Sequence, residues 1–436
     1  MLLLALLLAA AVMTIFVSLG SITLVAWPPL AVAGYLLVRF PRDHAIITFD
    51  RLWIGGLLAY ILLAHRRVPA AATSRFMKIG FGVFFLAFGI RAIAMSTSIS
   101  GPIQTWVDSV VLPSIVFVAV SRYATTRERT QRFALSLMIA GGLLGAIGLA
   151  ERIAGFELAS LSNGQRRYDE VIGATRISGP YSVPETYALS LVICFAATLY
   201  WLQSRGRGPY IWGILIAALE VSGIVFSFFR AAWIAALLVV IGSFGIRPSR
   251  FGRTLVIAGV VGSLVFAGTT QLEQHNKAFE ARTNNTDNIY GRLATYEQGI
   301  QLFKSAPLTG IGIDQYNAVV TDRAPVVFHK VKSVTFPHSS FIAVLAEQGL
   351  FGFVPLIFLS CGIWLVLRRI RAVASTSEEG VLAGSIAGAA AGYLIMSLTL
   401  TMLPYEPSNA FFAAFLGMTV GRLDVRSAET GRAVAQ

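Results

Sequence analysis

Long apolar runs divide this chain, and they limit its possible folds more than any other feature of the sequence. The runs are about 17 to 25 residues long, the length that an α-helix needs to cross the hydrocarbon core of a bilayer. Hydrophobic residues make up 56% of the 436 residues and charged residues only 13%. The runs are continuous, whereas the strands of a transmembrane β-barrel alternate between apolar and polar residues. The sequence therefore predicts an all-α, polytopic helical membrane protein.

The links between the runs carry most of the positive charge. The net charge is +13, and residues 122–132 alone contain four arginines. Cytoplasmic links of membrane proteins are enriched in lysine and arginine, so the charge indicates orientation in a membrane, and no nucleic-acid partner is expected. Cys194 and Cys361 both lie inside apolar runs, where they are expected to pack as small hydrophobic residues without forming a disulfide or a metal site.

Placing the basic links in the cytoplasm predicts about twelve crossings. Residues 1–38 cross either once or twice, and two crossings would give about thirteen. The N-terminus lacks a basic region before its apolar stretch, so a cleaved signal peptide is not expected. We expect transmembrane helices over 1–268, including an outer loop at 151–184, then a long outer loop over 269–350. Transmembrane helices and a cytoplasmic tail follow over 351–436.

The long outer loop has the pattern of a folded segment. Apolar side chains recur every three or four positions between residues 289 and 303, which predicts an amphipathic helix ended by Pro307. Gly310 and Gly312 suit a tight turn, and a second helix is expected to begin after Pro337, with a serine as its cap. Gly349 is expected to end that helix before the chain enters the membrane.

His338 is the residue in this loop best suited to chemistry. It stands at a predicted helix start just outside the membrane, in a chain with only five histidines. A neutral imidazole can accept a proton from an attacking hydroxyl group near neutral pH. The alternative is a histidine that only caps the helix or packs against its neighbours.

Three arginines, Arg176, Arg230 and Arg292, fall at outer edges of the membrane or in outer loops. A guanidinium group binds phosphate oxygens in a two-pronged geometry, so converging arginines would stabilise a pyrophosphate leaving group. Each of them could instead reach lipid phosphates or pair with a nearby acid.

Other charged residues are weaker candidates for a functional site. Arg91 and Glu220 lie within apolar runs, where a charge is costly and is expected to face protein or a polar cavity. Lys330 and Lys332 are either a basic rim for an acidic partner or a solvated loop face. The sequence has no cluster of metal ligands with the usual spacing, no aspartate pair at the start of an outer loop and no phosphate-binding Gly-rich motif. No metal and no cofactor are expected.

Four stretches resemble the O-antigen ligase and polymerase superfamily. They are Arg-Ile-Ser-Gly-Pro-Tyr at 176–181, Phe-Phe-Arg-Ala-Ala at 228–232, the residues from Arg292 to Gly312, and those from Pro337 to Gly352. Two positions depart from the family pattern: Phe229 stands where serine is usual, and Tyr296 stands where tryptophan is usual.

The resemblance implies an O-antigen ligase of the bacterial inner membrane with a periplasmic active site. Such an enzyme transfers a polysaccharide from undecaprenyl pyrophosphate to a sugar hydroxyl of lipid A-core, without a metal and with inversion. It implies that His338 is the catalytic base, that Arg176, Arg230 and Arg292 bind the pyrophosphate, and that residues 269–350 form the catalytic loop.

Three alternatives share some of these features. An O-antigen polymerase and a protein O-oligosaccharyltransferase would use the same site with different acceptors. A flippase or transporter of lipid-linked glycans would instead spread its charges through the crossings, whereas here they concentrate at the outer edge.

Overall fold

The computed structural model describes residues 72–95, 101–155, 168–169, 174–181, 183–204, 211–245, 287–334 and 336–435. The crossings predicted within residues 1–64 and at 255–268 lie outside the described residues. The number of about twelve crossings therefore stays a prediction.

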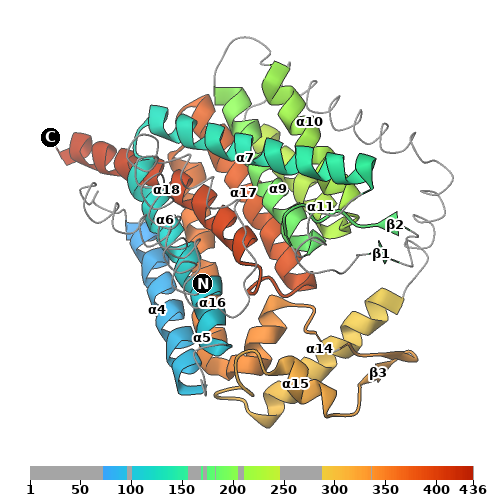
Figure 1. The fold of residues 1–436 in the computed structure, drawn as a ribbon. Helices are drawn as coiled ribbons and strands as arrows, with labels where there is room; N and C mark the ends of the chain where they lie inside the picture. The colour runs from blue at the N-terminus through green and yellow to red at the C-terminus, as the bar shows by residue number, and fades with distance from the viewer. Residues whose placement is uncertain are drawn as a thin grey trace, which may run out of the picture.

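Helices make up almost all of the described chain (Figure 1). Those before residue 246 are α4 (Ala72–Met95), α5 (Pro102–Trp106), the π-helical η1 (Val107–Val111), α6 (Leu112–Tyr123), α7 (Arg127–Ala154), α9 (Pro184–Ser204), α10 (Ile211–Phe226) and α11 (Arg230–Gly245). Those after residue 286 are α14 (Asp287–Ser305), α15 (Tyr316–Thr321), α16 (Ser340–Val373), α17 (Ser377–Thr399) and α18 (Glu406–Ala435). The described strands form two antiparallel two-residue pairs, β1 (Tyr168–Asp169) with β2 (Ala174–Thr175) and β3 (Val327–Phe328) with β4 (Val331–Lys332).

Six of the described helical segments are long and apolar enough to cross a membrane: Arg75–Met95, Pro102–Tyr123, α7, α9, α16 and α17. Two more apolar helices, α10 and α11, are shorter. The predicted fold class, an all-α polytopic membrane protein, is confirmed. The helix predicted between residues 289 and 303 is also present, as α14, but Ile289 and Leu293 of its predicted apolar face are exposed, and Ala294 and Leu302 are buried instead.

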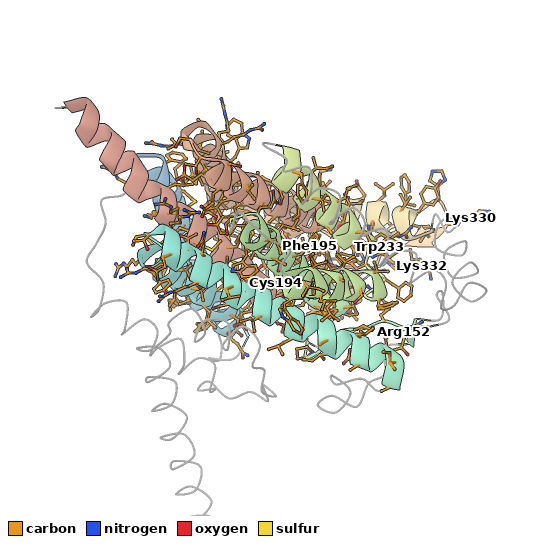
Figure 2. All side chains as sticks on the ribbon, turned by 90° about the horizontal axis from the view of Figure 1, so that it is seen from above. Arg152, Cys194, Phe195, Trp233, Lys330 and Lys332 are labelled. Carbon is orange, nitrogen blue, oxygen red and sulfur yellow. The ribbon has the colours of Figure 1, made fainter. Side chains whose placement is uncertain are left out.

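Helix α9 is the centre of the bundle, because nearly all of its side chains are buried among other helices. Figure 2 shows two of its residues, Cys194 and Phe195, in the middle of the packed helices. Cys194 is a free, buried cysteine, and Cys361 is a free, exposed one. Neither forms a disulfide with a described residue.

Helices α11 and α17 approach each other closely through glycines. A Cβ atom added to Gly388 would lie 2.5 Å from the carbonyl oxygen of Leu238, so no larger residue fits there without movement. In membranes such small residues allow helix backbones to pack directly. One face of α17 is therefore fully covered by α11.

Polar side chains tie α7, α9, α17 and α18 together at one end of the bundle. The guanidinium group of Arg127 on α7 forms an ion pair of 2.6 Å with Glu378 on α17, and the Tyr200 hydroxyl group of α9 donates to the same carboxylate. Glu379 pairs with Arg422 of α18 at 3.4 Å. This is the end that the arginine-rich links predict to be cytoplasmic; we call it the basic end.

The long loop folds at the opposite end, where α14, α15 and β3 gather beneath the bundle (Figure 1). Helix α16 begins there with Ser339 as its cap, since the Ser339 hydroxyl oxygen accepts from the backbone N–H of Ile342 at 3.5 Å. Both the helix start and the serine cap were predicted.

The prediction that a helix ends at Gly349 is confirmed. Gly349 has a φ of 61° and a ψ of −155°, which are not helical, and two helices meet there at a kink within α16. The residues after the kink have no helical acceptors, and the loop supplies replacements: Leu350 N–H donates to the Pro307 carbonyl oxygen at 2.9 Å and Phe351 N–H to that of Leu308 at 3.1 Å. Satisfied backbone groups allow the second of these helices to begin at the edge of the membrane.

Candidate active site

A tight turn between α10 and α11 places Arg230 at the first position of α11. Ser227 holds the turn, because its hydroxyl oxygen accepts from Phe229 N–H at 3.3 Å, and Phe228 takes a left-handed conformation with φ 52°. The side chain of Phe229 is buried in the core. The aromatic residue at the position where the family has serine therefore packs inward, and Ser227 supplies the hydroxyl contact in the turn.

Arg176 is held beside this turn by two partners. Its Nε donates to the carbonyl oxygen of Ser227 at 3.1 Å, and its Nη2 forms an ion pair of 2.8 Å with Glu185. The two side chains are only 16% and 14% exposed, so this pair is shielded from solvent and is stronger than a surface pair. Glu185 stands in the first turn of α9.

Arg292 on α14 faces the same group of charges. It interacts electrostatically with Tyr296, with Arg230 and with Glu185. Burial lowers the pKa of Arg292 from its ordinary value, and the positive charge of Arg230 lowers it further, while Tyr296 and Glu185 oppose the shift. An anion bound between Arg292 and Arg230 would reduce the repulsion between their positive charges, so the arrangement favours anion binding.

Hydrogen bonds fix the backbone around His338 from two sides. The Tyr296 hydroxyl oxygen of α14 lies 3.1 Å from the His338 carbonyl oxygen and 2.6 Å from that of Leu398, and its single proton can be donated to either one. Thr401, in the link between α17 and α18, donates to the carbonyl oxygen of Pro337, and Ser340 donates to that of Leu400 at 3.2 Å. The imidazole is thus carried by backbone that packs against α14 and the end of α17.

The surroundings of the His338 side chain favour its neutral form. Burial lowers the pKa of His338 and the nearby Arg292 lowers it further, whereas the Glu185 carboxylate raises it. Its Nδ1 atom is buried and has no hydrogen-bond partner among the described residues. A neutral imidazole with an available nitrogen can accept a proton.

The structure therefore brings the four predicted site residues to the same end of the bundle. Glu185 interacts with Arg176, Arg292 and His338, and Arg230 interacts with Arg292. The sequence analysis missed Glu185. It was detectable, because it is a carboxylate next to Pro184 at the outer end of an apolar run, the same position that singled out the arginines.

Two other stretches that carry the family resemblance bind each other and contribute no side chain to this group of charges. Residues 307–312 and 346–351 bind each other through their backbones, including Ile311 N–H to the Ala346 carbonyl oxygen at 3.0 Å and Gly312 N–H to that of Glu347 at 2.9 Å. Gly310 has φ 67° and its Cα lies against the backbone of Glu347. The Glu347 carboxylate accepts from Tyr316 N–H at 3.2 Å.

The remaining charged residues lie elsewhere. Arg91 donates to the Thr309 carbonyl oxygen at 2.5 Å, and Glu220 accepts from Thr198 at 2.9 Å, so the two do not pair with each other. Figure 2 shows Lys330 and Lys332 at the edge of the molecule, away from the central helices. Among the described residues, no group of three or more His, Cys, Asp or Glu side chains could hold a metal ion.

Residues 190–357 match the family described as O-antigen ligase. This part of the chain is therefore similar to the O-antigen ligase and polymerase superfamily, as the sequence motifs indicated. The match begins within α9 and ends within α16, so it includes Arg230, Arg292 and His338 and leaves out Arg176 and Glu185. Members of the O-antigen ligase family are glycosyltransferase-like membrane enzymes.

One solved structure similar to this chain is described as "Structural coordination of polymerization and crosslinking by a peptidoglycan synthase complex". It shares 16% sequence identity with a TM-score of 0.40, and the alignment covers 84% of this chain and 98% of that one. A likeness at this level carries no argument about fold or function. No curated protein matches the chain.

Proposed function

We propose that this protein is an O-antigen ligase. It transfers a polysaccharide from undecaprenyl pyrophosphate to a sugar hydroxyl of lipid A-core, at the periplasmic face of the bacterial inner membrane. The observation that carries the proposal is a half-buried His338 at the end of the bundle opposite the basic end, in electrostatic contact with Arg292 and Glu185. The family match supports the same class of reaction.

In the proposed reaction, the acceptor hydroxyl oxygen attacks the anomeric carbon of the donor sugar and forms the new glycosidic bond. The bond between that carbon and the pyrophosphate oxygen breaks from the opposite face, which inverts the configuration. The imidazole of His338 takes the hydroxyl proton. The leaving pyrophosphate gains negative charge, which the guanidinium groups of Arg230 and Arg292 stabilise.

Arg176 and Glu185 have a positioning role in this proposal. Two of the guanidinium nitrogens of Arg176 already donate to protein acceptors, so Arg176 offers the pyrophosphate fewer hydrogen bonds than a free arginine would. Glu185 lies among the positive charges and keeps them together while the donor is absent.

The pH dependence of transfer tests the role of Glu185. Protonation of His338 removes the base, so transfer should fall on the acid side as the imidazole gains its proton. Glu185 raises the pKa of His338 against the lowering by burial and Arg292. In Glu185→Gln that pKa should drop, and the acid limb of kcat/KM against pH should move to lower pH.

The matched control for this measurement is Glu297→Gln, an exposed carboxylate on α14. Its acid limb should coincide with that of the wild type. An unmoved limb in Glu185→Gln, or a limb at higher pH, would show that Glu185 does not act on the base.

An electrophoretic profile of surface lipopolysaccharide from cells lacking the protein tests the function itself. A ligase predicts loss of all O-antigen from the surface, with long chains left on the carrier lipid and recovery when the gene is restored. Lipid A-core carrying a single repeat unit would instead establish a polymerase. An unchanged profile would contradict both and direct attention to a protein acceptor.

A further inference from the structure

A cavity of about 490 Å³ lies between α16 and α17, bounded also by α4, η1, α6 and α18. Its size is typical of sites for small ligands. Its walls are mainly apolar and aromatic, and include Phe81, Phe84, Leu359, Ile363 and Phe412. Walls of this chemistry suit a hydrocarbon, and a charged group would find ionic partners only at Arg368 and Arg371 among the lining residues.

The cavity exists because α17 has two faces of small residues with different neighbours. Its glycine face packs directly on α11, as described above. Its other small face presents Ala387, Ala390 and Ala391 to the cavity, and these alanines stay partly exposed. Trp364 on α16 and Leu394 on α17 also line it and are about half exposed, so the cavity opens sideways from the bundle.

The cavity runs along α16 from one end of the bundle to the other. Ser340 and Phe341 line it at the end near the candidate active site, two and three residues after His338. Arg368 and Arg371 line it near the basic end. The straight part of α16 between Gly349 and Arg371 is roughly 30 Å long at 1.5 Å per residue, which is the thickness of the hydrocarbon core.

Three of the polar side chains that line the cavity, Ser340, Tyr393 and Asn409, are already hydrogen-bonded within the protein, whereas the Ser109 hydroxyl group has no partner among the described residues. Ser340 donates to the Leu400 carbonyl oxygen and accepts from Met402 N–H. The Tyr393 hydroxyl group donates to the Asn409 side chain at 2.6 Å, and the Asn409 amide donates to the Met402 carbonyl oxygen at 3.2 Å. The three bonded side chains offer little to a ligand, so the occupant is recognised by its apolar surface.

We propose that this cavity binds the polyisoprenoid tail of the lipid-linked donor. The inference rests on the proposed function and adds a binding site that the reaction itself does not require. In a polyisoprenyl pyrophosphate the sugar, the pyrophosphate and the tail are joined one after another. A donor whose anomeric carbon lies at His338 must therefore begin its tail within the same region, where Ser340 and Phe341 open the cavity.

The acceptor fits the cavity less well, because the core sugars separate its reacting hydroxyl group from its acyl chains. The main rival is a phospholipid of the other leaflet, with its phosphate on Arg368 and Arg371 and an acyl chain in the cavity. The experiment below separates this rival from the donor tail.

Filling the cavity tests the proposal. In Ala387→Phe and Ala391→Phe an aromatic ring enters the cavity. The control is Ala236→Phe, which makes the same change at a partly exposed position of α11 that does not line the cavity. The purified proteins transfer one glycan from two donors, one with a full-length polyisoprenoid tail and one with a short tail. We expect the cavity variants to lose about tenfold or more in kcat/KM with the long-tail donor, and less than about twofold with the short-tail donor.

Equal losses with both donors would overturn the proposal, because they would report damaged packing. Unchanged kinetics with both donors would overturn it as well. Thermal unfolding in detergent checks that the variants and the Ala236→Phe control fold alike.

A binding measurement keeps this test independent of catalysis. A polyisoprenyl pyrophosphate without glycan, carrying a benzophenone in its tail, is photolysed with the protein and the labelled peptides are identified. We expect labelling on α16 and α17 that is reduced in Ala387→Phe and unchanged in His338→Ala. The proposal would be overturned if neither α16 nor α17 were labelled. It would also be overturned if excess phosphatidylglycerol displaced the label and unlabelled polyisoprenyl pyrophosphate did not. Failure of transfer in the wild type together with normal labelling would overturn only the proposed function.

Discussion

Replacing His338 by alanine is expected to lower glycan transfer by about 10²- to 10⁴-fold, the range that a general base contributes. The substitution removes the imidazole and keeps the backbone contacts that hold this segment, since Tyr296 and Thr401 bind the carbonyl oxygens of residues 338 and 337. Its Nδ1 atom has no partner among the described residues. The variant should therefore reach the membrane in normal amounts, and the loss should be chemical.

The measurement is transfer by purified protein, with membrane abundance and thermal unfolding recorded for each variant. His329→Ala is the matched control, because His329 lies in the turn between β3 and β4 and stacks on Tyr290, with ring centroids 4.7 Å apart. It should transfer like the wild type. Wild-type transfer by His338→Ala would remove the base assignment and leave His338 as a structural residue.

Replacing Arg292 by lysine is the second change with a large expected effect, a loss of about 10²- to 10³-fold in kcat. Lysine keeps the charge in water but lacks the two-pronged geometry for phosphate oxygens. The site also disfavours a lysine charge, because burial and Arg230 already lower the pKa of Arg292. A lysine, whose pKa starts lower, would lose its proton more readily there.

Arg230→Lys should show a smaller loss of the same kind, since Arg230 is more exposed than Arg292. The control is Arg323→Lys, at an exposed position of the loop, which should leave transfer unchanged. Full activity in both Arg230→Lys and Arg292→Lys would favour arginines that only contact lipid phosphates.

The part of the fold that depends on local pattern could be predicted from the sequence. The length of the apolar runs is enough to predict transmembrane helices, and the spacing of apolar residues between 289 and 303 is enough to predict α14 as a helix. Ser339 is a typical N-cap residue, so the start of α16 was also predictable. The residues proposed for the site could be named because charges at the ends of apolar runs are few. Their meeting at one end follows from the alternating direction of the helices.

What could not be predicted depends on contacts between distant residues. The break at Gly349 was predicted, but the carbonyl oxygens of Pro307 and Leu308 that replace its lost helical bonds come from a distant part of the loop, and no local pattern records that. For the same reason Arg91 binds a loop carbonyl oxygen at residue 309. Glu185 was overlooked because the motifs directed attention to positive charge, although its carboxylate interacts with Arg176, Arg292 and His338.

Hydrogen bonds and ion pairs join the helices at both ends of the bundle, and they limit how far the helices can move relative to one another. A carrier that moves its substrate by alternating access opens one end of its helices while the other closes. Here such rocking would have to break the bonds of Glu378 with α7 and α9 at one end and those of Tyr296 and Ser340 with the end of α17 at the other. The described helices are thus joined as a rigid frame. Under the proposed function, the moving parts of the cycle would be the lipid substrates, which would diffuse in and out sideways within the plane of the membrane.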